Sequence, residues 1–320
     1  LDIVLNNKAT AAASLFAPAA AVRMRPAGFT GTPMPKDEAA AANRPAGALI
    51  DYVLKMAAKQ AVVLEVRDEH GDLVRRYSSA DASPKPDLAK IAIAPQWVEA
   101  PAPLSTAPGH HRFLWPLHYS TLASPQGSPG SPGADGVWAP PGRYSLILEV
   151  DGARLTQPLI VAPDPRISLP AAAYAAQFAL ARRIEAEKQR LEAASHEVSA
   201  LSKALAERRK SAPNPRIGPA FEALEARLRE LDGSPPPGQW WVPPRSLTSL
   251  RAVSGALDGV AAAVDGADNA PSPDAVSGFE QARKSLAVAL AAWETLKTKD
   301  LAVLNAALKK AGQPGIEIKH

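Results

Sequence analysis

The chain has 320 residues and a formal net charge of +4, with 36 Lys and Arg against 32 Asp and Glu. The two signs are interspersed, whereas nucleic-acid binding would call for a concentrated basic stripe with interleaved aromatic residues, so we expect no nucleic-acid partner. The chain has no cysteine, which excludes disulfides, thiolate metal sites and cysteine nucleophiles. No run reaches the roughly 18 apolar residues of a membrane helix, so no membrane span is expected.

The first 45 residues are rich in alanine and proline and show little periodicity. Short extended pieces are expected at Leu15–Pro18 and Ala21–Arg25, and residues 1–45 as a whole are predicted to be an extended linker. The chain begins with Leu1, not Met, and no signal peptide precedes it. We therefore expect it to be a processed product or a fragment of a longer protein.

Residues 46–165 have the pattern of a β domain, in which apolar or alternating segments are separated by turns. Asp151-Gly152 is a strong two-residue hairpin signal, and a Gly/Ser/Pro-rich stretch at 123–136 is predicted to be a loop. Because no helical segment interrupts the series, the pattern predicts an immunoglobulin-like or fibronectin-like antiparallel β-sandwich. The predicted strands are Leu49–Leu54, Val62–Arg67, Leu73–Tyr77, Gly109–Tyr119, Arg143–Val150 and Ala153–Val161.

The period becomes helical over residues 170–311. Ile184, Leu191, Val198 and Leu205 are seven apart, which predicts a long helix with one apolar seam. Later apolar stripes predict four further helices, within 217–231, 247–264, 272–296 and 301–308.

Two of these helices have a predicted N-cap residue. Ser272, which is followed by Pro273, is the predicted cap of the helix within 272–296, and Asp300 is the predicted cap of the last helix. Because each helix has one apolar face to bury, the pattern predicts an antiparallel helical bundle. The predicted fold is thus α+β and multi-domain: a linker at 1–45, a sandwich at 46–165, a bundle at 170–311 and a tail at 312–320.

Three histidines lie close together in the strand predicted at 109–119. Residues two apart in a strand share a face, so His111 is expected on the core face with Phe113, and His110 on the opposite face with His118. His110 and His118 would be roughly 26 Å apart along an extended strand, whereas a metal needs converging ligands. We therefore interpret the block as a core strand, with His110 and His111 as the alternative metal ligands. The core face is completed by Trp115, Leu117 and Tyr119.

The sequence contains no recognisable catalytic constellation. A glycosidase needs two carboxylates about 5–9 Å apart across a cleft, and nothing in the sequence pairs the acids of the predicted strands and turns. Neither a Gly-x-Ser-x-Gly nucleophile elbow nor a glycine-rich phosphate loop occurs. We therefore predict no catalytic residue and no cofactor.

A series of short motifs occurs in a fixed order along nearly the whole chain. They are Gly47–Tyr52, Leu73–Ser79, Gly109–Trp115, Pro141–Tyr144, Thr156–Leu159, Asp164–Arg166, Val264–Asp268, and Trp293 followed by Asp300–Asn305. The set resembles the C-terminal region of bacterial sortilin-like β-propeller proteins, often described as BNR-repeat glycosyl hydrolases or exo-sialidases. The family block at 109–119 has Met, Asp and Arg where this chain has His110, Pro116 and His118.

The resemblance implies a non-catalytic accessory or scaffolding region of an exported protein, either periplasmic or extracellular. This region would pack on a β-propeller of the same precursor or of a separate chain, with residues 1–45 lying against it. No Asp-box of the propeller is present, because Ser78–Asp81 lacks the following Gly and Trp. The alternative is that the chain forms part of a sialidase-like glycoside hydrolase whose catalytic propeller lies outside it.

Four tryptophans are the candidate binding residues because they lie in proline-rich segments, where a large ring is not automatically part of a core. They are Trp97, Trp138, Trp240 and Trp241. Such rings can anchor their own loops onto the sandwich or bundle, pack on the propeller, or stack on a sugar. The last reading would make the chain a carbohydrate-binding module with a glycan partner.

Overall fold

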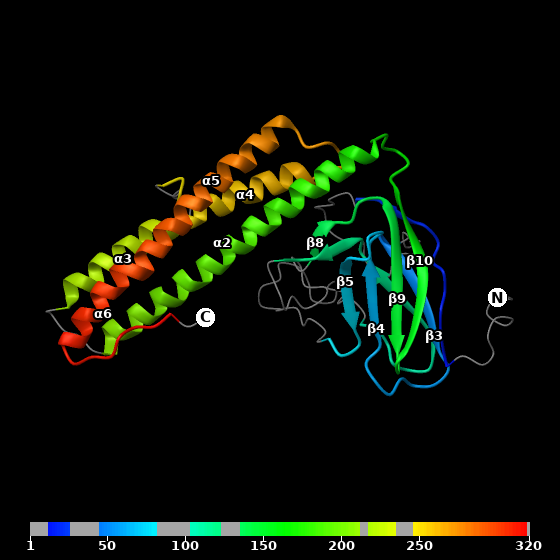
Figure 1. The fold of residues 1–320 in the computed structure, drawn as a ribbon, viewed down its shortest axis with the longest axis horizontal. Coiled ribbons are helices and arrows are strands. Elements are labelled where there is room, and N and C mark those ends of the chain that lie inside the picture. The colour runs from blue at the N-terminus through cyan, green and yellow to red at the C-terminus, as the bar shows by residue number, and fades with distance from the viewer. Residues whose placement is uncertain are drawn as a thin grey trace, which may run out of the picture. The chain divides into compact units, whose positions relative to one another are not determined.

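The computed structural model describes residues 12–25, 45–81, 103–122, 135–211, 217–234 and 246–318 (Figure 1). The chain divides into two compact units. The strand unit is Leu1–Phe178 together with Ala267–Asn269, and the helical unit is Ala179–Gly266 together with Ala270–His320. Strands precede helices along the chain, which confirms the predicted combination of β and α structure.

One sheet of the strand unit has the strand order β2-β10-β9-β4-β5. Its antiparallel members are β4 (Val63–Arg67), β5 (Leu73–Ser78), β9 (Gly142–Val150) and β10 (Ala153–Pro163). Asp151 and Gly152 form the turn from β9 to β10, as predicted, with positive φ angles of 48° and 82°. The remaining strand, β2 (Ala21–Arg23), runs parallel to β10, so the prediction of a wholly antiparallel arrangement is wrong at this edge. No tight hairpin joins these two strands, so nothing local fixes their relative direction.

A second sheet has the order β1-β3-β6, with β1 (Ala13–Leu15), β3 (Ala48–Leu54) and β6 (Gly109–Trp115) all antiparallel. β1 and β2 therefore add residues 13–15 and 21–23 to the two sheets, and β2 lies within the extended piece predicted at Ala21–Arg25. Their first and third residues are buried, which are Ala13 and Leu15 in β1, and Ala21 and the ion-paired Arg23 in β2.

The histidine-containing strand is shorter than predicted. It ends at Trp115, because Pro116 has no N–H to donate to the ladder and Leu117 adopts a left-handed conformation with φ of 60°. The chain then forms β7 (His118–Ser120), which pairs with β8 (Asp135–Trp138). β8 begins at Asp135, inside the stretch at 123–136 that was predicted to be a loop, so the loop prediction is wrong at residues 135 and 136.

Aromatic side chains connect the two sheets. The ring centroids of Tyr77 in β5 and Phe113 in β6 are 4.7 Å apart, and those of Trp115 in β6 and Tyr144 in β9 are 5.4 Å apart. The Trp115 indole N–H donates to the His118 carbonyl at 3.0 Å, which holds the chain just after the break at Pro116. Of the predicted core face of this block, Phe113, Trp115, Leu117 and Tyr119 are buried, whereas His111 is only partly buried.

The helices lie where the sequence predicts them. Their bounds are α2 (Ala171–Ser211), α3 (Gly218–Asp232), α4 (Leu250–Asp265), α5 (Pro273–Thr295) and α6 (Leu301–Lys310). Ser272 caps α5 as predicted, its hydroxyl accepting a hydrogen bond from the Ala275 N–H at 3.1 Å. No helix in these described ranges is long and apolar enough to cross a membrane.

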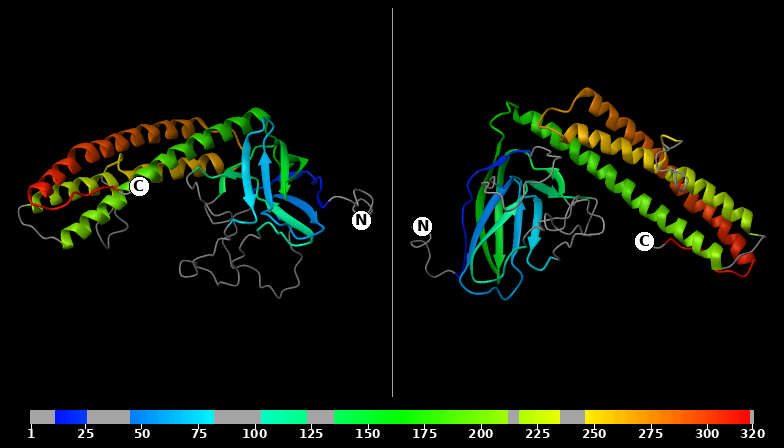
Figure 2. Two further views of the ribbon diagram at one scale, coloured as in Figure 1. Left: turned by 60° about the horizontal axis from the view of Figure 1, so that its bottom comes forward. Right: turned by 180° about the vertical axis from the view of Figure 1, so that it is seen from behind.

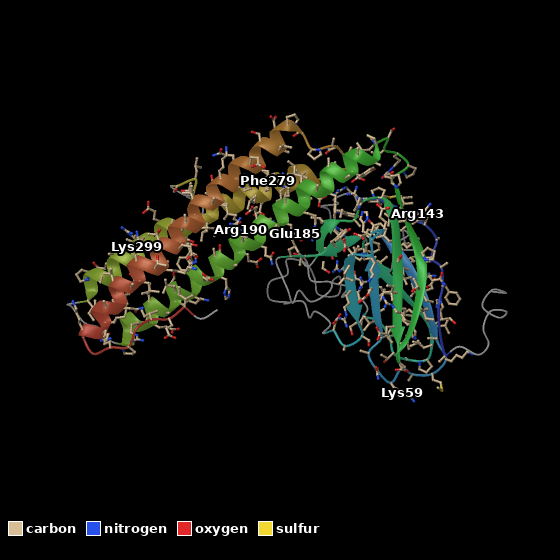
Figure 3. All side chains as sticks on the ribbon, viewed as in Figure 1. Lys59, Arg143, Glu185, Arg190, Phe279 and Lys299 are labelled. Carbon is tan, nitrogen blue, oxygen red and sulfur yellow. The ribbon has the colours of Figure 1, made fainter. Side chains whose placement is uncertain are left out.

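In the helical unit, α2 lies beside α4 and α5 in two opposite views (Figures 1 and 2). The predicted seam of α2 is buried, and ion pairs flank it: Arg183 reaches Glu280 of α5 and Lys188 reaches Asp258 of α4, at 2.7 and 2.6 Å. The Arg183 guanidinium also lies 4.8 Å from the ring centroid of Phe279, which Figure 3 labels on α5.

The prediction that Asp300 begins a separate last helix is wrong. Its backbone is helical and its side chain makes no capping hydrogen bond. A π-helical turn, η3 (Leu296–Asp300), runs from α5 directly into α6. The Asp300 carboxylate instead accepts a hydrogen bond from Arg227 of α3 at 2.7 Å, an interaction between helices that local sequence cannot reveal.

Candidate functional site

A cluster of aromatic and charged side chains surrounds Trp138 in the strand unit. Trp138 lies opposite His118 in the β7–β8 pair, and their ring centroids are 4.1 Å apart. The guanidinium groups of Arg23 and Arg25 lie 5.7 and 5.0 Å from the Trp138 ring centroid. Positive charges at this distance from an indole ring are attracted by its π face. We call these residues, together with Tyr174 and Asp268, the Arg–Trp cluster.

Asp268 supplies the negative charge of the cluster. Its Oδ1 accepts a hydrogen bond from Nη1 of Arg23 and another from Nε of Arg25 at 2.6 Å. The side chains of Arg23 and Asp268 are 3% and 1% exposed, so the pair is nearly removed from water. A buried ion pair stabilises a fold only if both partners are present, because removal of one leaves a charge in a poorly solvated place.

Tyr174 and Gln177 of α2 complete the surroundings. The Arg23 guanidinium lies 5.3 Å from the Tyr174 ring centroid, and Gln177 donates from Nε2 to the Ala267 carbonyl at 2.6 Å, beside Asp268. Burial, followed by the nearby Asp268 charge, raises the pKa of Tyr174, so its hydroxyl stays neutral. The cluster therefore binds and orients a carboxylate, and in this structure the carboxylate comes from the chain itself.

Only one of the four candidate tryptophans lies in the part of the chain that the structure describes. Trp138 is half-buried in the Arg–Trp cluster, where its ring lies next to His118 and Arg25. Trp97, Trp240 and Trp241 lie outside the described residues. The structure thus brings Trp138 together with charged residues that the sequence had not connected to it.

The two candidate metal-binding histidines point to opposite faces of β6. His111 packs against Tyr52, with ring centroids 5.1 Å apart, and its Nε2 lies 2.6 Å from the Ala107 carbonyl oxygen. His110 lies near Asp51, with 3.6 Å between Nε2 and Oδ1. Within the described ranges, no three His, Asp or Glu side chains gather as metal ligands would.

Asp51 is bound more tightly by Arg112 than by His110. Arg112 donates from Nε and Nη2 to the two carboxylate oxygens at 2.8 and 2.9 Å, a bidentate geometry. This hydrogen bonding lowers the pKa of Asp51. Asp51 thus remains a carboxylate that fixes Arg112 across the β3–β6 pair, and its charge is unsuited to a general acid.

No local sequence pattern identified Arg23, Arg25, Tyr174 or Asp268 as site residues. Arg23 and Arg25 are two positions apart at the end of β2, so they share a face, which is the local signal that was available. Asp268 lies in the Val264–Asp268 motif, but its partner Arg23 is 245 positions away. Only the folded chain connects them.

No family model, curated protein or solved structure matches this chain. The relation to sortilin-like proteins therefore stays a prediction from the ordered motifs.

Proposed function

We propose that the chain is a non-catalytic accessory region of an exported sortilin-like β-propeller protein. In this proposal the strand unit is an immunoglobulin-like sandwich and the helical unit is an antiparallel bundle. The region packs on a propeller of the same precursor or of a separate chain, in the periplasm or outside the cell, and supports the binding face of that propeller. It acts by burial and ion pairing, not by making or breaking bonds.

The observation that carries the proposal is the Arg–Trp cluster. Two arginines, a tryptophan and a tyrosine are the kind of group that could recognise an anionic ligand. Here they hold Asp268 of the same chain, and the side chains of Arg23 and Asp268 are almost fully buried. This arrangement supports a structural role, because the groups best suited to binding already have a partner.

The motif residues in the strand unit give further support, since they contact one another. Asp51 and Arg112 come from two different motifs and form the bidentate pair. Tyr144, from a third motif, packs on Trp115 and donates its hydroxyl to the Pro140 carbonyl at 2.7 Å. Residues that define the resemblance thus hold the strand unit together, as expected for a shared scaffold.

Motif residues in the helical unit also make contacts within their own unit. The Trp293 indole N–H donates to Glu197 at 2.7 Å. The Asn305 amide accepts from the Ile316 N–H at 2.8 Å and donates to its carbonyl at 3.1 Å, which ties the end of the chain to α6. These contacts support a role for the motifs in folding.

Trp138 does not favour the carbohydrate-binding alternative. A ring that stacks on a sugar needs an open face, whereas Trp138 lies against His118 and two guanidinium groups. Substitution of Trp138 by Ala is therefore expected to lower stability and to leave the response on a glycan array unchanged.

The proposed function is tested by affinity capture of the full chain from its source, with identification of the captured proteins by mass spectrometry. The expected result is a partner with propeller-type repeats, together with no turnover of a panel of sialosides and other glycosides by the chain alone. Glycoside turnover by the purified chain, or a captured set without any propeller protein, would overturn the proposal.

A further inference from the structure

The five-stranded sheet of the strand unit carries three arginines that form no ion pair with any described residue. They are Arg76 of β5, Arg143 of β9 and Arg154 of β10, all exposed, and Figure 3 labels Arg143. Every other arginine described in the strand unit pairs with an aspartate or a glutamate. These paired arginines are Arg23, Arg25, Arg67, Arg75, Arg112 and Arg166.

The strand register places the three unpaired arginines on one face of the sheet. Side chains directly opposite in an antiparallel pair point to the same side, and so do side chains two apart in one strand. Arg76 is aligned, through β4, with Ile147 of β9. Arg143 and Glu149 lie an even number of positions from Ile147, and Glu149 lies opposite Arg154. We call this surface the arginine face.

The arginine face is the solvent side of the sheet, and it is shallow. The alternate residues of β9, such as Leu146 and Leu148, are fully buried on the other side. A hollow of about 130 Å³ lies between β4, β9 and β10, smaller than the roughly 300–1,000 Å³ of small-molecule sites. Among the described strands, the register places no aromatic ring on this face, whereas single-stranded nucleic acids stack on such rings. These features favour a protein partner.

We propose that the arginine face binds an acidic surface of a partner protein. Guanidinium groups form bidentate hydrogen bonds with carboxylates, and arginine is among the residues that contribute most binding energy at protein interfaces. Ile160 lies opposite Arg143 and is 45% exposed, so it adds an apolar contact. The partner is defined by its carboxylates, whether or not it is the propeller of the proposed function.

Two glutamates on the same face favour a protein surface over a polyanion. Glu65 and Glu149 lie among the arginines, and Glu65 is paired with Arg67 at 2.9 Å. Glutamates repel the uniformly negative backbone of DNA, whereas a protein surface can place carboxylates and basic side chains where each is matched. Because exposed ion pairs are weak and screened by salt, we expect weak binding that decreases as the salt concentration rises.

Fluorescence anisotropy at low ionic strength tests this binding with the full chain. The probe is a labelled peptide of Glu, Leu and a smaller number of Lys, and a single-stranded DNA of the same net charge is the polyanion for comparison. The combined substitution Arg76→Glu, Arg143→Glu and Arg154→Glu should raise the dissociation constant of the peptide about tenfold or more. The natural chain should bind the peptide more tightly than the DNA.

A charge-matched variant shows whether position or only net charge is responsible. Lys203→Glu, Lys284→Glu and Lys309→Glu together change the net charge by the same amount at exposed positions of the helical unit, and should leave peptide binding within about twofold of the natural chain. Circular dichroism checks that both triple variants are folded. Equal weakening by the two variants, tighter binding of the DNA, or no peptide binding at low salt would overturn the proposal.

The arginine side-chain signals in the NMR spectrum of the isotope-labelled chain provide a second readout, which locates the bound peptide. The Nε–H signals of Arg76, Arg143 and Arg154 should shift during the titration. The signal of Arg166, which is paired with Asp164, should not shift. Shifts that leave the three arginines of the arginine face unchanged would place the peptide elsewhere and would contradict the assignment.

Discussion

Arg25 donates from Nε to Oδ1 of Asp268 at 2.6 Å, joining residues 243 positions apart in the sequence. The same oxygen accepts from Arg23, whose side chain is almost fully buried. One carboxylate oxygen is therefore shared by two guanidinium groups. Because Asp268 belongs to the short segment Ala267–Asn269 between α4 and α5, this carboxylate also holds that segment in the strand unit.

Asp268→Asn is expected to destabilise the strand unit by about 3–5 kcal/mol, because it removes the carboxylate charge that pairs with the buried Arg23 and the partly buried Arg25. Urea denaturation followed by tryptophan fluorescence measures the loss. Asp258→Asn is the control: its pair with Lys188 is exposed and should contribute less than about 1 kcal/mol. Equal effects of the two substitutions would contradict the role assigned to Asp268.

Gly47→Ala should destabilise the strand unit by about 3 kcal/mol or more, through backbone strain and steric overlap together. Gly47 has a φ of 140°, and a Cβ there would lie 2.4 Å from the Trp115 carbonyl oxygen. Gly71→Ala isolates the backbone cost alone, because Gly71 has a φ of 84° and no atom within 4 Å of the added Cβ, so about 1 kcal/mol is expected. Thermal denaturation compares the stability of the two variants. Equal stability of Gly47→Ala and Gly71→Ala would contradict the prediction, because it would mean that the steric overlap with Trp115 adds no cost.

Asp164 should make the stability of the strand unit depend on pH in the acid range. Hydrogen bonds from Arg166, at 2.9 Å from Nε and 2.6 Å from Nη2, lower the pKa of Asp164 from 3.8 to about 2. Since the folded-state pKa is the lower one, the contribution is complete above pH 3.8 and is lost as the pH falls to about 2. Asp164→Asn should thus be less stable than the natural chain at neutral pH, and the difference should vanish in that acid window.

Denaturation at a series of pH values measures this effect. Arg166→Gln should produce the same pH-dependent loss, and the double variant should lose little more than either single one, because the two side chains act as a pair. A difference between Asp164→Asn and the natural chain that stays constant down to the lowest pH would contradict this assignment.

Glu197→Ala should destabilise the helical unit by about 1–3 kcal/mol, because Trp293 is buried and its indole N–H would lose its acceptor. Glu197→Gln keeps an acceptor for the indole and loses only the charge that faces Lys297 at 3.1 Å, so its effect should be smaller. Glu192→Ala, at an exposed position of the same helix, controls for the change in helix propensity. Thermal unfolding followed by circular dichroism should rank Glu197→Ala as the least stable of the three.

Local sequence patterns predicted most elements but not their ends. The Asp151-Gly152 turn, the seam of α2 and the Ser272 cap each depend on residues a few positions apart, and all three are present. The strand through His118 was predicted too long, because alternation of apolar residues continued past Pro116 although the backbone direction changed there. Asp300 has the composition of an N-cap, but helix packing carried α5 into α6 without a break.

The sequence by itself determined the order of the predicted strands and helices, the buried faces of most of them, the Asp151-Gly152 turn and the Ser272 cap, because these depend on side chains close together in the chain. The tertiary structure decided that β2 joins its sheet in parallel, that His118 lies in a separate strand paired with Trp138, and that Trp138 lies among Arg23, Arg25 and Asp268. These contacts join residues far apart in the sequence, and burial of the shared core, not local propensity, brings them together.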